Sequence, residues 1–549
     1  MWKVVVFVFL LSHVEVHVNG AADEKPESAS DASKPVENVK TEETEALSTN
    51  DPASQIVPGN LLVIPMDGSH WVVVKALAQE MGRRGHRVTV VMPEVSMRMS
   101  PGEHYDTLTY PVPYDKATLD QFLTTHKILM DNSASLFEKI GHLQQIYKFI
   151  HTTAESLIFN DTVISHLAQQ RFDAVLTDPL VPVGALIARK LGLPIINVLR
   201  VMPCALDYKA AGCPSPPSYV PRFFTGYTDK MTFKERTFNT MVVLLEPLMC
   251  KLMYWSFDNI AYQFLGEKVG VVEVLSESAI WLLRIDFTLE FPRPLMPNMV
   301  LIGGINCNVR NPLPKDLESW VSGKDGFIVF TLGTAVLDMP EETTSIFLEA
   351  FRQIPQKVIW RYGGKVPDNV PDNVKMMHWV PQNDLLAQPG VRAFITHAGS
   401  HGLYEGLCHA VPMLMLPIAG DQPDNAKRLA SREVGIVMDL FTLTTESLLQ
   451  GLNEVINDSR YKENVQRLST LHKDRPMDPI DLSVYWTEFV MRHKGAKHLR
   501  PAVHDLNWLQ YFCLDVIASL MTVLLICVIV TVKCFKLCFR KLGRKRKQE

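Results

Sequence analysis

The segment best suited to chemistry is residues 393–405, where an apolar stretch ends at Thr396 and His397 and a glycine-containing turn follows. A helix is expected to open at about Ser400 to Leu403, so its first backbone N–H groups have no partner within the helix. Such groups bind anions, and a diphosphate fits them. Residues 379–386 and 417–425 flank this segment at a spacing of one strand and one helix each. Three such segments in order are more informative than a single glycine turn.

His70 is a second candidate, because it lies where the first expected strand meets the first expected helix. An imidazole there can face a cleft and remove the proton of a hydroxyl group. A histidine at a helix start can also be a cap or a surface residue. Asp178, at the end of an apolar strand, could orient that imidazole and stabilise its charge, and it could instead cap the helix after Pro179.

Alternating strands and helices must position these residues. Strands at 61–65 and 87–93 flank a helix at 71–83, and strands at 172–179 and 194–199 flank a helix at 183–191. This alternation predicts a parallel sheet. It restarts at about residue 302, with expected strands at 327–333, 357–362, 374–380, 391–397, 411–417 and 434–440, and with helices beginning near Pro340, Asn383, Leu403, Asp424 and Thr444.

The chain is therefore expected to be an α/β protein with two doubly wound halves. Ligands of open parallel sheets gather at the carboxyl ends of the strands, so a cleft between two such halves suits a reaction of two substrates. The net charge of -4 is small, and no basic face indicates nucleic-acid binding.

Together these segments resemble the UDP-glucuronosyltransferases, and most of all the vertebrate branch that conjugates bilirubin and phenols. The resemblance runs from about Asn60 to the tail and includes residues 177–179, 202–222, 231–233 and 303–304 as well as 379–425. It implies a GT-B fold, in which two Rossmann-like domains face a cleft. The N-terminal, acceptor-binding domain would span 58–301, and the C-terminal, UDP-sugar-binding domain would span 302–480.

The resemblance also implies roles for single residues at the nucleotide. Trp379 would stack on the uracil with Gln382 nearby, and Glu405 would accept hydrogen bonds from the ribose hydroxyls. His397 and the turn after it would hold the diphosphate. The other expected diphosphate contacts and neighbours are Ser69, Thr331 or Thr334, Arg361, Gly399, Ser400, His401 and Gly402.

For the sugar, the resemblance implies that Asp421 and Gln422 bind ring hydroxyls. Arg284 is the candidate for the carboxylate of glucuronate, because a guanidinium binds carboxylates with two hydrogen bonds. A salt bridge at the surface or between domains is its other possible role. The family also implies that His70 is the general base, that Asp178 is its partner, and that the displacement is direct and inverting.

Two positions depart from the wider superfamily, since Ala398 and His401 stand where many relatives carry Gly and Asn. This puts His401 in doubt as a phosphate ligand. No Asp-x-Asp pair, the common metal-holding motif of other glycosyltransferases, occurs in the chain. We therefore expect no metal and no cofactor in the chemistry, with UDP-glucuronate as co-substrate and helix N-termini and side chains meeting the charge of the leaving group.

Both ends of the chain predict a membrane protein of the secretory pathway. Residues 1–20 have the pattern of a cleaved signal peptide, and 21–57 form an acidic low-complexity segment expected to be disordered. After a returning helix and juxtamembrane segment at 481–510, residues 511–532 predict one transmembrane helix, and 533–549 form a basic cytoplasmic tail. This predicts lumenal domains on the endoplasmic reticulum membrane. Lys545 and Lys547 resemble a retrieval signal, and a plain stop-transfer cluster is the alternative.

Asn160 and Asn457 begin sequons and are candidate glycosylation sites. The lumenal cysteines are widely spaced, and one disulfide, such as Cys204 with Cys213, is possible.

We expect a glycosyltransferase that moves glucuronic acid from UDP-glucuronate to a hydroxyl of a small lipophilic acceptor, giving a β-glucuronide and UDP in detoxification. One alternative keeps the fold and uses UDP-glucose, UDP-galactose or UDP-N-acetylglucosamine on lipids or steroids. Another is a non-catalytic partner that binds nucleotide sugars, alone or in an oligomer with relatives. The apolar segment 209–266 fits lipophilic acceptors, contact with the membrane surface, or an ordinary core helix.

Overall fold

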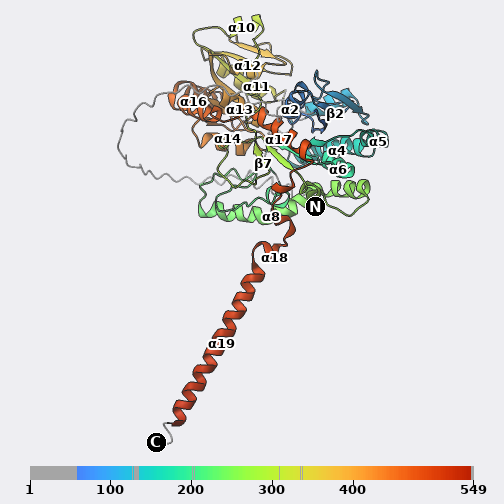
Figure 1. Ribbon diagram of the computed structural model, residues 1–549. Helices are drawn as coiled ribbons and strands as arrows, with labels where there is room; N and C mark the ends of the chain where they lie inside the picture. The colour runs from blue at the N-terminus through green and yellow to red at the C-terminus, as the bar shows by residue number, and fades with distance from the viewer. Residues whose placement is uncertain are drawn as a thin grey trace, which may run out of the picture.

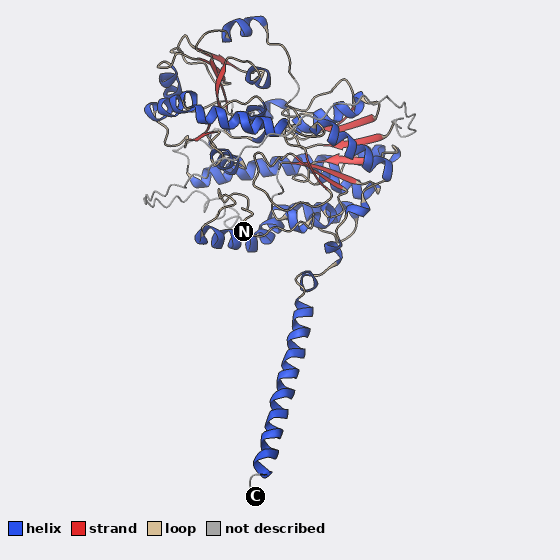
Figure 2. Ribbon diagram, turned by 60° about the vertical axis from the view of Figure 1, so that its left-hand side comes forward, coloured by secondary structure: helices blue, strands red, loops and turns tan. Residues whose placement is uncertain are grey.

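The computed structural model describes residues 58–545 apart from 126–127, 129–134, 201, 203, 308–309, 334–335 and 337. The predicted signal peptide, the acidic segment at 21–57, Thr334 and Lys547 lie outside the described residues. Figures 1 and 2 show a globular part from which one long helix projects.

Seven parallel strands form the N-terminal sheet in the order β3-β2-β1-β4-β5-β6-β7. This is the doubly wound arrangement, and the strand order reverses between β1 and β4, where Ile64 lies opposite Thr177. The strands are β1 (Asn60–Ile64), β2 (Arg87–Pro93), β3 (Asp106–Tyr110), β4 (Ala174–Thr177), β5 (Ile195–Leu199), β6 (Ile280–Leu283) and β7 (Met299–Leu301).

Helices cover both faces of this sheet because successive strand side chains point to opposite sides. Leu61 and Val63 pack into the layer with α2 (Trp71–Arg83), whereas Leu62 and Ile64 pack into the layer with α6 (Val183–Leu191). The remaining helices of this half are α3 (Lys116–Thr124), α4 (Leu136–Ile158), α5 (Asp161–Gln169), α7 (Leu206–Lys209), α8 (Phe233–Leu265) and α9 (Val271–Leu275).

Six parallel strands form the C-terminal sheet in the order β10-β9-β8-β11-β12-β13, which reverses between β8 and β11. Its strands are β8 (Phe327–Thr331), β9 (Lys357–Arg361), β10 (Val374–Met377), β11 (Val391–Thr396), β12 (Met413–Met415) and β13 (Gly435–Val437). Its helices are α10 (Lys315–Val321), α11 (Glu341–Phe351), α12 (Gln382–Leu386), α13 (Ser400–Cys408), α14 (Gln422–Ala430), α15 (Thr445–Asn457) and α16 (Ser459–Lys473). The expected fold of two doubly wound halves is confirmed.

The chain then returns to its N-terminal half through α17 (Pro479–His493), whose Val484, Val490 and Met491 are buried with the α2 layer. A hydrogen bond of 3.1 Å between His86 Nε2 and Glu488 Oε1 fixes this helix to the first half.

α18 (Trp508–Tyr511) leads into α19 (Leu514–Lys545), whose apolar part, Leu514–Arg540, is long enough to cross a membrane. The helix does not coincide with the expected membrane span of 511–532, and the position of that span in a bilayer stays a prediction. Cys513 has a positive φ of 52°, so the helix begins after it, and it continues through the basic tail because Lys and Arg are good helix formers. α8 is also long and apolar enough by composition, although part of it is buried in the globular half.

Candidate active site

The two points where the strand order reverses face one cavity of about 980 Å³. The cavity is lined from both halves, by residues following β1, β2 and β5 and by residues following β8, β11 and β12. Every described residue that the sequence nominated as base or donor contact lines it, except Asp178, which lies behind His70.

His70 and Asp178 form a close pair, because they follow the neighbouring strands β1 and β4. His70 Nδ1 lies 2.5 Å from Asp178 Oδ2. Asp178 is buried, and its other carboxylate oxygen accepts a hydrogen bond of 2.9 Å from the backbone N–H of Leu180. The carboxylate thus orients the imidazole and also holds the turn before α6. His70 makes no side-chain capping bond to α2, so the capping role is wrong for it.

This pairing leaves the second ring nitrogen of His70 for a substrate. When Nδ1 donates its proton to Asp178, Nε2 carries the basic lone pair. Among the described residues none forms a hydrogen bond with Nε2, and the His70 side chain is 23% exposed in the cavity wall.

The turn after β11 presents the start of α13 to the cavity. Gly399 is the N-cap and has no side chain with which to satisfy the first N–H groups of the helix. Ala398 adopts the left-handed conformation, with φ of 62°, which turns the chain sharply from the strand into the helix. This arrangement makes an anion site of the kind a diphosphate requires.

His397 lies between two glycines at this turn. A Cβ atom at Gly333 or at Gly399 would approach the imidazole ring to 2.6 Å or 2.3 Å, so both positions need glycine. Burial lowers the pKa of His397 to about 4. The ring is therefore neutral at physiological pH and meets a phosphate as a hydrogen-bond donor rather than as a cation.

A short chain of hydrogen bonds joins three of the residues that the sequence predicted to contact the UDP-sugar. Thr331 Oγ1 donates to Gln382 Oε1 at 2.5 Å, and the Gln382 amide donates to Glu405. Burial raises the pKa of Glu405 to about 7. Trp379 stands at the edge of the cavity with 61% of its surface exposed, so its ring face is open to a planar base.

Asp421 and Gln422 begin α14 and are held by local hydrogen bonds. Asp421 Oδ2 accepts from the Asn425 amide at 2.8 Å. Gln422 Oε1 accepts from the backbone N–H groups of Ile418 at 2.7 Å and Ala419 at 3.0 Å, so its NH₂ group points away from these donors.

Arg284 is buried in the cavity wall and reaches across to α13. It donates to Ser400 Oγ at 2.9 Å, and its other terminal nitrogen lies 3.1 Å from His401 Nε2. Burial, with Arg200 nearby, lowers its pKa to about 10, so it remains a cation. Within the described ranges no acidic side chain forms an ion pair with Arg284, so the salt-bridge alternative is wrong.

Two further nominated residues are already engaged with the protein. His401 Nε2 lies 2.9 Å from the carbonyl oxygen of Ser69, and burial keeps the pKa of His401 well below its usual value. Its side chain therefore links the two halves. Arg361 donates to the carbonyl of Gly333 and lines the cavity.

Several residues at the cleft were missed by sequence reasoning. Arg98 follows the carboxyl end of β2 and lines the cavity, a position that the strand pattern alone could have indicated. Asp424 accepts from the backbone N–H groups of Phe224 at 2.7 Å and Gly226 at 2.8 Å, joining α14 to the N-terminal half. Nothing in the sequence pairs these segments.

A buried ion-pair group also joins the halves. Arg200 donates to Glu290 at 2.5 Å and to Asn425 at 2.9 Å, and Arg428 lies 2.8 Å from Glu290. Although burial opposes ionisation, the two arginines lower the pKa of Glu290 to about 2. Asn425 in turn holds Asp421, so the N-terminal half contacts the donor side of the cleft through buried polar groups.

The suggested Cys204–Cys213 disulfide is wrong. Cys307 and Cys408 form a disulfide, with their Cα atoms 5.9 Å apart, whereas Cys204 and Cys213 are free. These partners are 101 residues apart in sequence, so spacing gave no indication of the pairing. Of the sequons, Asn160 caps α5 and Asn457 ends α15, and their glycosylation remains a prediction.

Two facing doubly wound halves, with a histidine–aspartate pair and a helix start at one shared cavity, define a GT-B glycosyltransferase. The solved structures that resemble this one have the same fold. The calicheamicin glycosyltransferase CalG4 matches with a TM-score of 0.55 and 16% identity over 80% of this chain and 100% of that chain. The O. sativa protein Os79 in complex with UDP matches with a TM-score of 0.52 and 16% identity over 79% and 100%.

The chain belongs to the UDP-glucuronosyltransferases. The model of the family described as "UDP-glucoronosyl and UDP-glucosyl transferase" matches residues 59–549. Human UDP-glucuronosyltransferase 1A1 is 43% identical over 499 residues, which cover 89% of this chain and 94% of the human one. Rat UDP-glucuronosyltransferase 1-2 is 44% identical over 506 residues, which cover 89% and 94%. The family resemblance seen in the sequence is thereby confirmed, and the chain is a glycosyltransferase.

Proposed function

We propose that this enzyme transfers glucuronic acid from UDP-glucuronate to a hydroxyl group of a small lipophilic acceptor. The observation that carries the proposal is the His70–Asp178 pair, whose free ring nitrogen faces the cavity that also receives the start of α13. The relatives are named UDP-glucuronosyltransferases, which supports the donor.

In the proposed reaction His70 Nε2 removes the acceptor hydroxyl proton as the oxygen attacks the anomeric carbon. The bond from that carbon to the diphosphate breaks on the opposite face, so an α-linked donor gives a β-glucuronide. Asp178 stabilises the imidazolium that forms, and the proton later passes to solvent. The negative charge on UDP is met by the N–H groups of α13, by the neutral His397 and by the residues around them.

Arg284 supports glucuronate over neutral sugars in this proposal. Its buried guanidinium lines the cavity without an acidic partner among the described residues, and a carboxylate on the sugar would supply one. Asp421 and Gln422 would contact the ring hydroxyls. We expect no metal or cofactor in these steps, so treatment with EDTA should leave turnover in place.

Membrane placement is also part of the proposal. α19 spans the endoplasmic reticulum membrane with its basic end in the cytoplasm, and the catalytic halves lie in the lumen. α8 lies at the end of the globular part from which α18 and α19 leave (Figures 1 and 2). Its exposed apolar residues outside the cavity, which would contact the bilayer surface, are Phe233, Met241, Leu244, Leu245, Leu248 and Tyr262.

The test is to express the full chain alone in microsomes and supply 4-ethylphenol with UDP-glucuronate. His70→Ala and Asp178→Ala should each lower kcat by about 10² to 10⁴ while UDP still binds. Normal turnover in either variant would remove the assigned base. Parallel reactions with UDP-glucose, UDP-galactose and UDP-N-acetylglucosamine test the donor, and absence of transfer from every donor would favour a binding partner without activity.

A further inference from the structure

The inner face of α8 forms part of the cavity wall in the N-terminal, acceptor-binding half. Most of the side chains that line the cavity there are apolar, including those of Phe223 and Phe224 in the preceding loop. From α8 itself the apolar lining residues are Val242, Met249, Leu252, Met253 and Trp255. Glu246 lines the cavity among them and is the acidic residue that α8 contributes.

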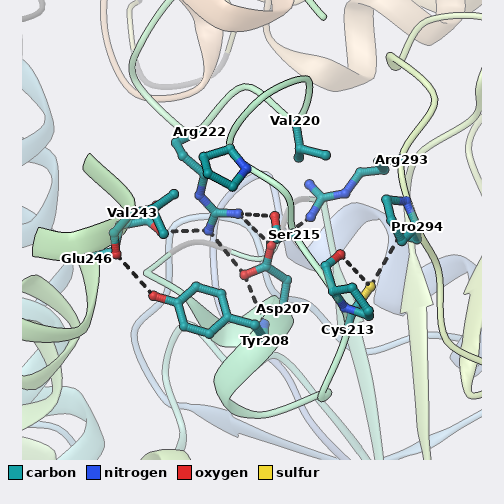
Figure 3. A network of polar contacts seen from close by, with 12 residues as sticks. Asp207, Tyr208, Cys213, Ser215, Val220, Arg222, Val243, Glu246, Arg293 and Pro294 are labelled. Atoms are coloured by element: carbon teal, nitrogen blue, oxygen red, sulfur yellow. Dashed lines mark hydrogen bonds and ion pairs between the residues drawn. The ribbon is translucent and has the colours of Figure 1, made fainter. Parts of the chain in front are cut away.

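Glu246 stands at the end of a buried series of ion pairs, shown in Figure 3. Asp207 accepts from Arg222 at 2.7 Å and 3.1 Å and from Arg293 at 2.6 Å, so its carboxylate is fully engaged. Arg222 lies between Asp207 and Glu246, with one terminal nitrogen 2.7 Å from Glu246 Oε2. Two acidic and two basic side chains balance the charge of the group.

The contact with Arg222 leaves Glu246 incompletely satisfied. The pair is close enough for an ion pair but is not aligned as a hydrogen bond, and Oε2 has no other partner in the described residues. No hydrogen bond to the second oxygen, Oε1, is formed by any described residue. Yet the residue is 96% buried, with only 4% exposed.

The nearest phenol is engaged elsewhere. Pro247 interrupts the hydrogen bonding of α8 because proline has no N–H to donate to the carbonyl of Val243. The hydroxyl of Tyr208 donates to that carbonyl at 3.4 Å. Tyr208 thus compensates for the proline and does not serve Glu246.

A buried carboxylate whose one partner is a poorly aligned arginine is costly, so its place in the wall of a cavity is significant. We propose that Glu246 is a specificity-determining residue that accepts a hydrogen bond from a second hydroxyl group on the acceptor, away from the hydroxyl that reacts. The inference rests on the proposed function, because it concerns the acceptor of the same transfer. In this arrangement the reacting hydroxyl of the acceptor lies at His70 and its second hydroxyl lies at Glu246. The apolar residues that line the cavity contact the hydrocarbon part of the acceptor between these two hydroxyls.

Burial raises the pKa of Glu246 despite Arg222 beside it. A hydroxyl donor would favour the ionised form and partly offset that burial. Because the ion-pair group is already balanced in charge, a neutral hydroxyl is a better partner than an ammonium group.

The experiment compares matched acceptors in membranes carrying the full chain. Phenols and 4-phenylphenols, each with and without a terminal hydroxymethyl group, provide two lengths. For wild type we expect kcat/KM to favour the hydroxymethyl member at one length or both by about tenfold, since hydrogen bonds to charged groups are stronger than neutral ones. Glu246→Met should bring that ratio close to one, and Glu246→Gln, which keeps a neutral acceptor, should give an intermediate ratio.

Asp207→Asn is the matched control. It weakens the same ion-pair group from a position that does not line the cavity. Its ratio should equal that of wild type even if its thermal stability falls, because Glu246 remains in place. UDP binding, measured for every variant, verifies that each has folded.

Three results would overturn the inference. The first is a wild-type ratio near one at both lengths, and the second is the same ratio in wild type and Glu246→Met. An equal change in Asp207→Asn would assign the effect to packing rather than to recognition and would also overturn it. If wild type transfers glucuronic acid to none of the acceptors, the proposed function itself fails, which is a distinguishable outcome.

Discussion

At the residue scale, the site depends on neutral or nearly neutral groups that burial keeps from ionising. His397 has a pKa of about 4, and Glu405 has a pKa of about 7, both because of desolvation. A diphosphate brought into this cavity therefore meets neutral hydrogen-bond donors as well as cations, since the lining also includes Arg98, Arg200, Arg284 and Arg361. Preorganised donors of this kind stabilise charge without rearranging during the reaction.

The raised pKa of Glu405 predicts pH-dependent UDP binding. If Glu405 accepts from the ribose hydroxyls as proposed, these donors favour its ionised carboxylate, which is lost as the pH falls through about 7. UDP affinity should therefore weaken below pH 7 and level off above it. Equilibrium binding of UDP from pH 5.5 to 8.5 measures this without involving the proton transfer at His70. In Glu405→Gln the part of the profile contributed by Glu405 should be lost, and an unchanged profile in that variant would assign the titration to another group.

Ala398 predicts a contrast between two substitutions. Its φ of 62° is available to glycine, whereas alanine accepts it at a cost of about 1 to 2 kcal/mol. Ala398→Gly relieves that cost, but glycine loses more backbone entropy on folding and the buried methyl group is removed. These effects oppose one another, so the free energy of unfolding should change by less than about 1 kcal/mol. Ala398→Val places a branched side chain in a fully buried left-handed position and should cost about 2 kcal/mol or more. Thermal unfolding of the purified chain compares the two, and equal midpoints would contradict the argument.

The sequence could predict a site residue when a local strand or helix pattern placed it. It could not predict contacts between segments that are far apart along the chain. His70, Asp178 and His397 each follow a strand and Thr331 ends one, so the strand pattern alone placed them at the carboxyl edges of the two sheets. The Cys307–Cys408 disulfide and the contact of Asp424 with Phe224 join segments that share no local pattern. Only the folded arrangement of both halves brings such pairs together.

At the scale of elements, long periodic segments were predicted best. The helices at 71–83 and 183–191 and the strand at 87–93 match their expected limits, because an amphipathic helix or an apolar run bounded by Gly or Pro leaves little freedom. Shorter strands were overestimated: β12 covers only Met413–Met415 of the expected 411–417. Pro412 and Pro417 at its borders lack the N–H that would continue the ladder.

α8 shows why one apolar segment allowed three interpretations. Its inner face lines the cavity, while Leu244 and Leu248 are 75% and 51% exposed on its outer face. We predict that the outer face contacts lipid. A benzophenone amino acid placed at Leu244 of the full chain in microsomes should crosslink to phospholipid, whereas the same residue at Val366, an exposed apolar position between β9 and β10, should not. Equal lipid crosslinking at both positions, or none at Leu244, would contradict membrane contact.

At the scale of the whole molecule, the two halves form one catalytic unit because polar contacts cross the cleft at several depths. His401 contacts Ser69, Arg200 contacts Asn425, and α17 returns the chain from the second half to the first. The residues proposed for acceptor and donor are thereby held at fixed positions on opposite walls. Such fixed positions are what a reaction between two bound substrates requires.

Asp424 provides a direct test of this coupling. Its two carboxylate oxygens hold the backbone N–H groups of Phe224 and Gly226, and Phe224 lines the cavity. Asp424→Asn replaces one carboxylate oxygen by an NH₂ group, so one of the two hydrogen bonds from the loop at Phe224 and Gly226 is lost. The loop is then less firmly held where it lines the part of the cavity proposed for the acceptor substrate. We expect the acceptor KM to rise about tenfold, as for loss of one hydrogen bond to a charged group, while UDP affinity changes much less.

Asp458→Asn is the matched control, because it changes a half-buried helix cap that does not line the cavity, and asparagine caps as well as aspartate. Its KM for the acceptor should equal that of wild type. Initial rates over a range of acceptor at saturating UDP-glucuronate measure the difference. If Asp424→Asn instead weakened UDP binding and left the acceptor KM unchanged, Asp424 would serve α14 and the donor alone, and the loop would be held in place by its packing rather than by contact with the opposite half.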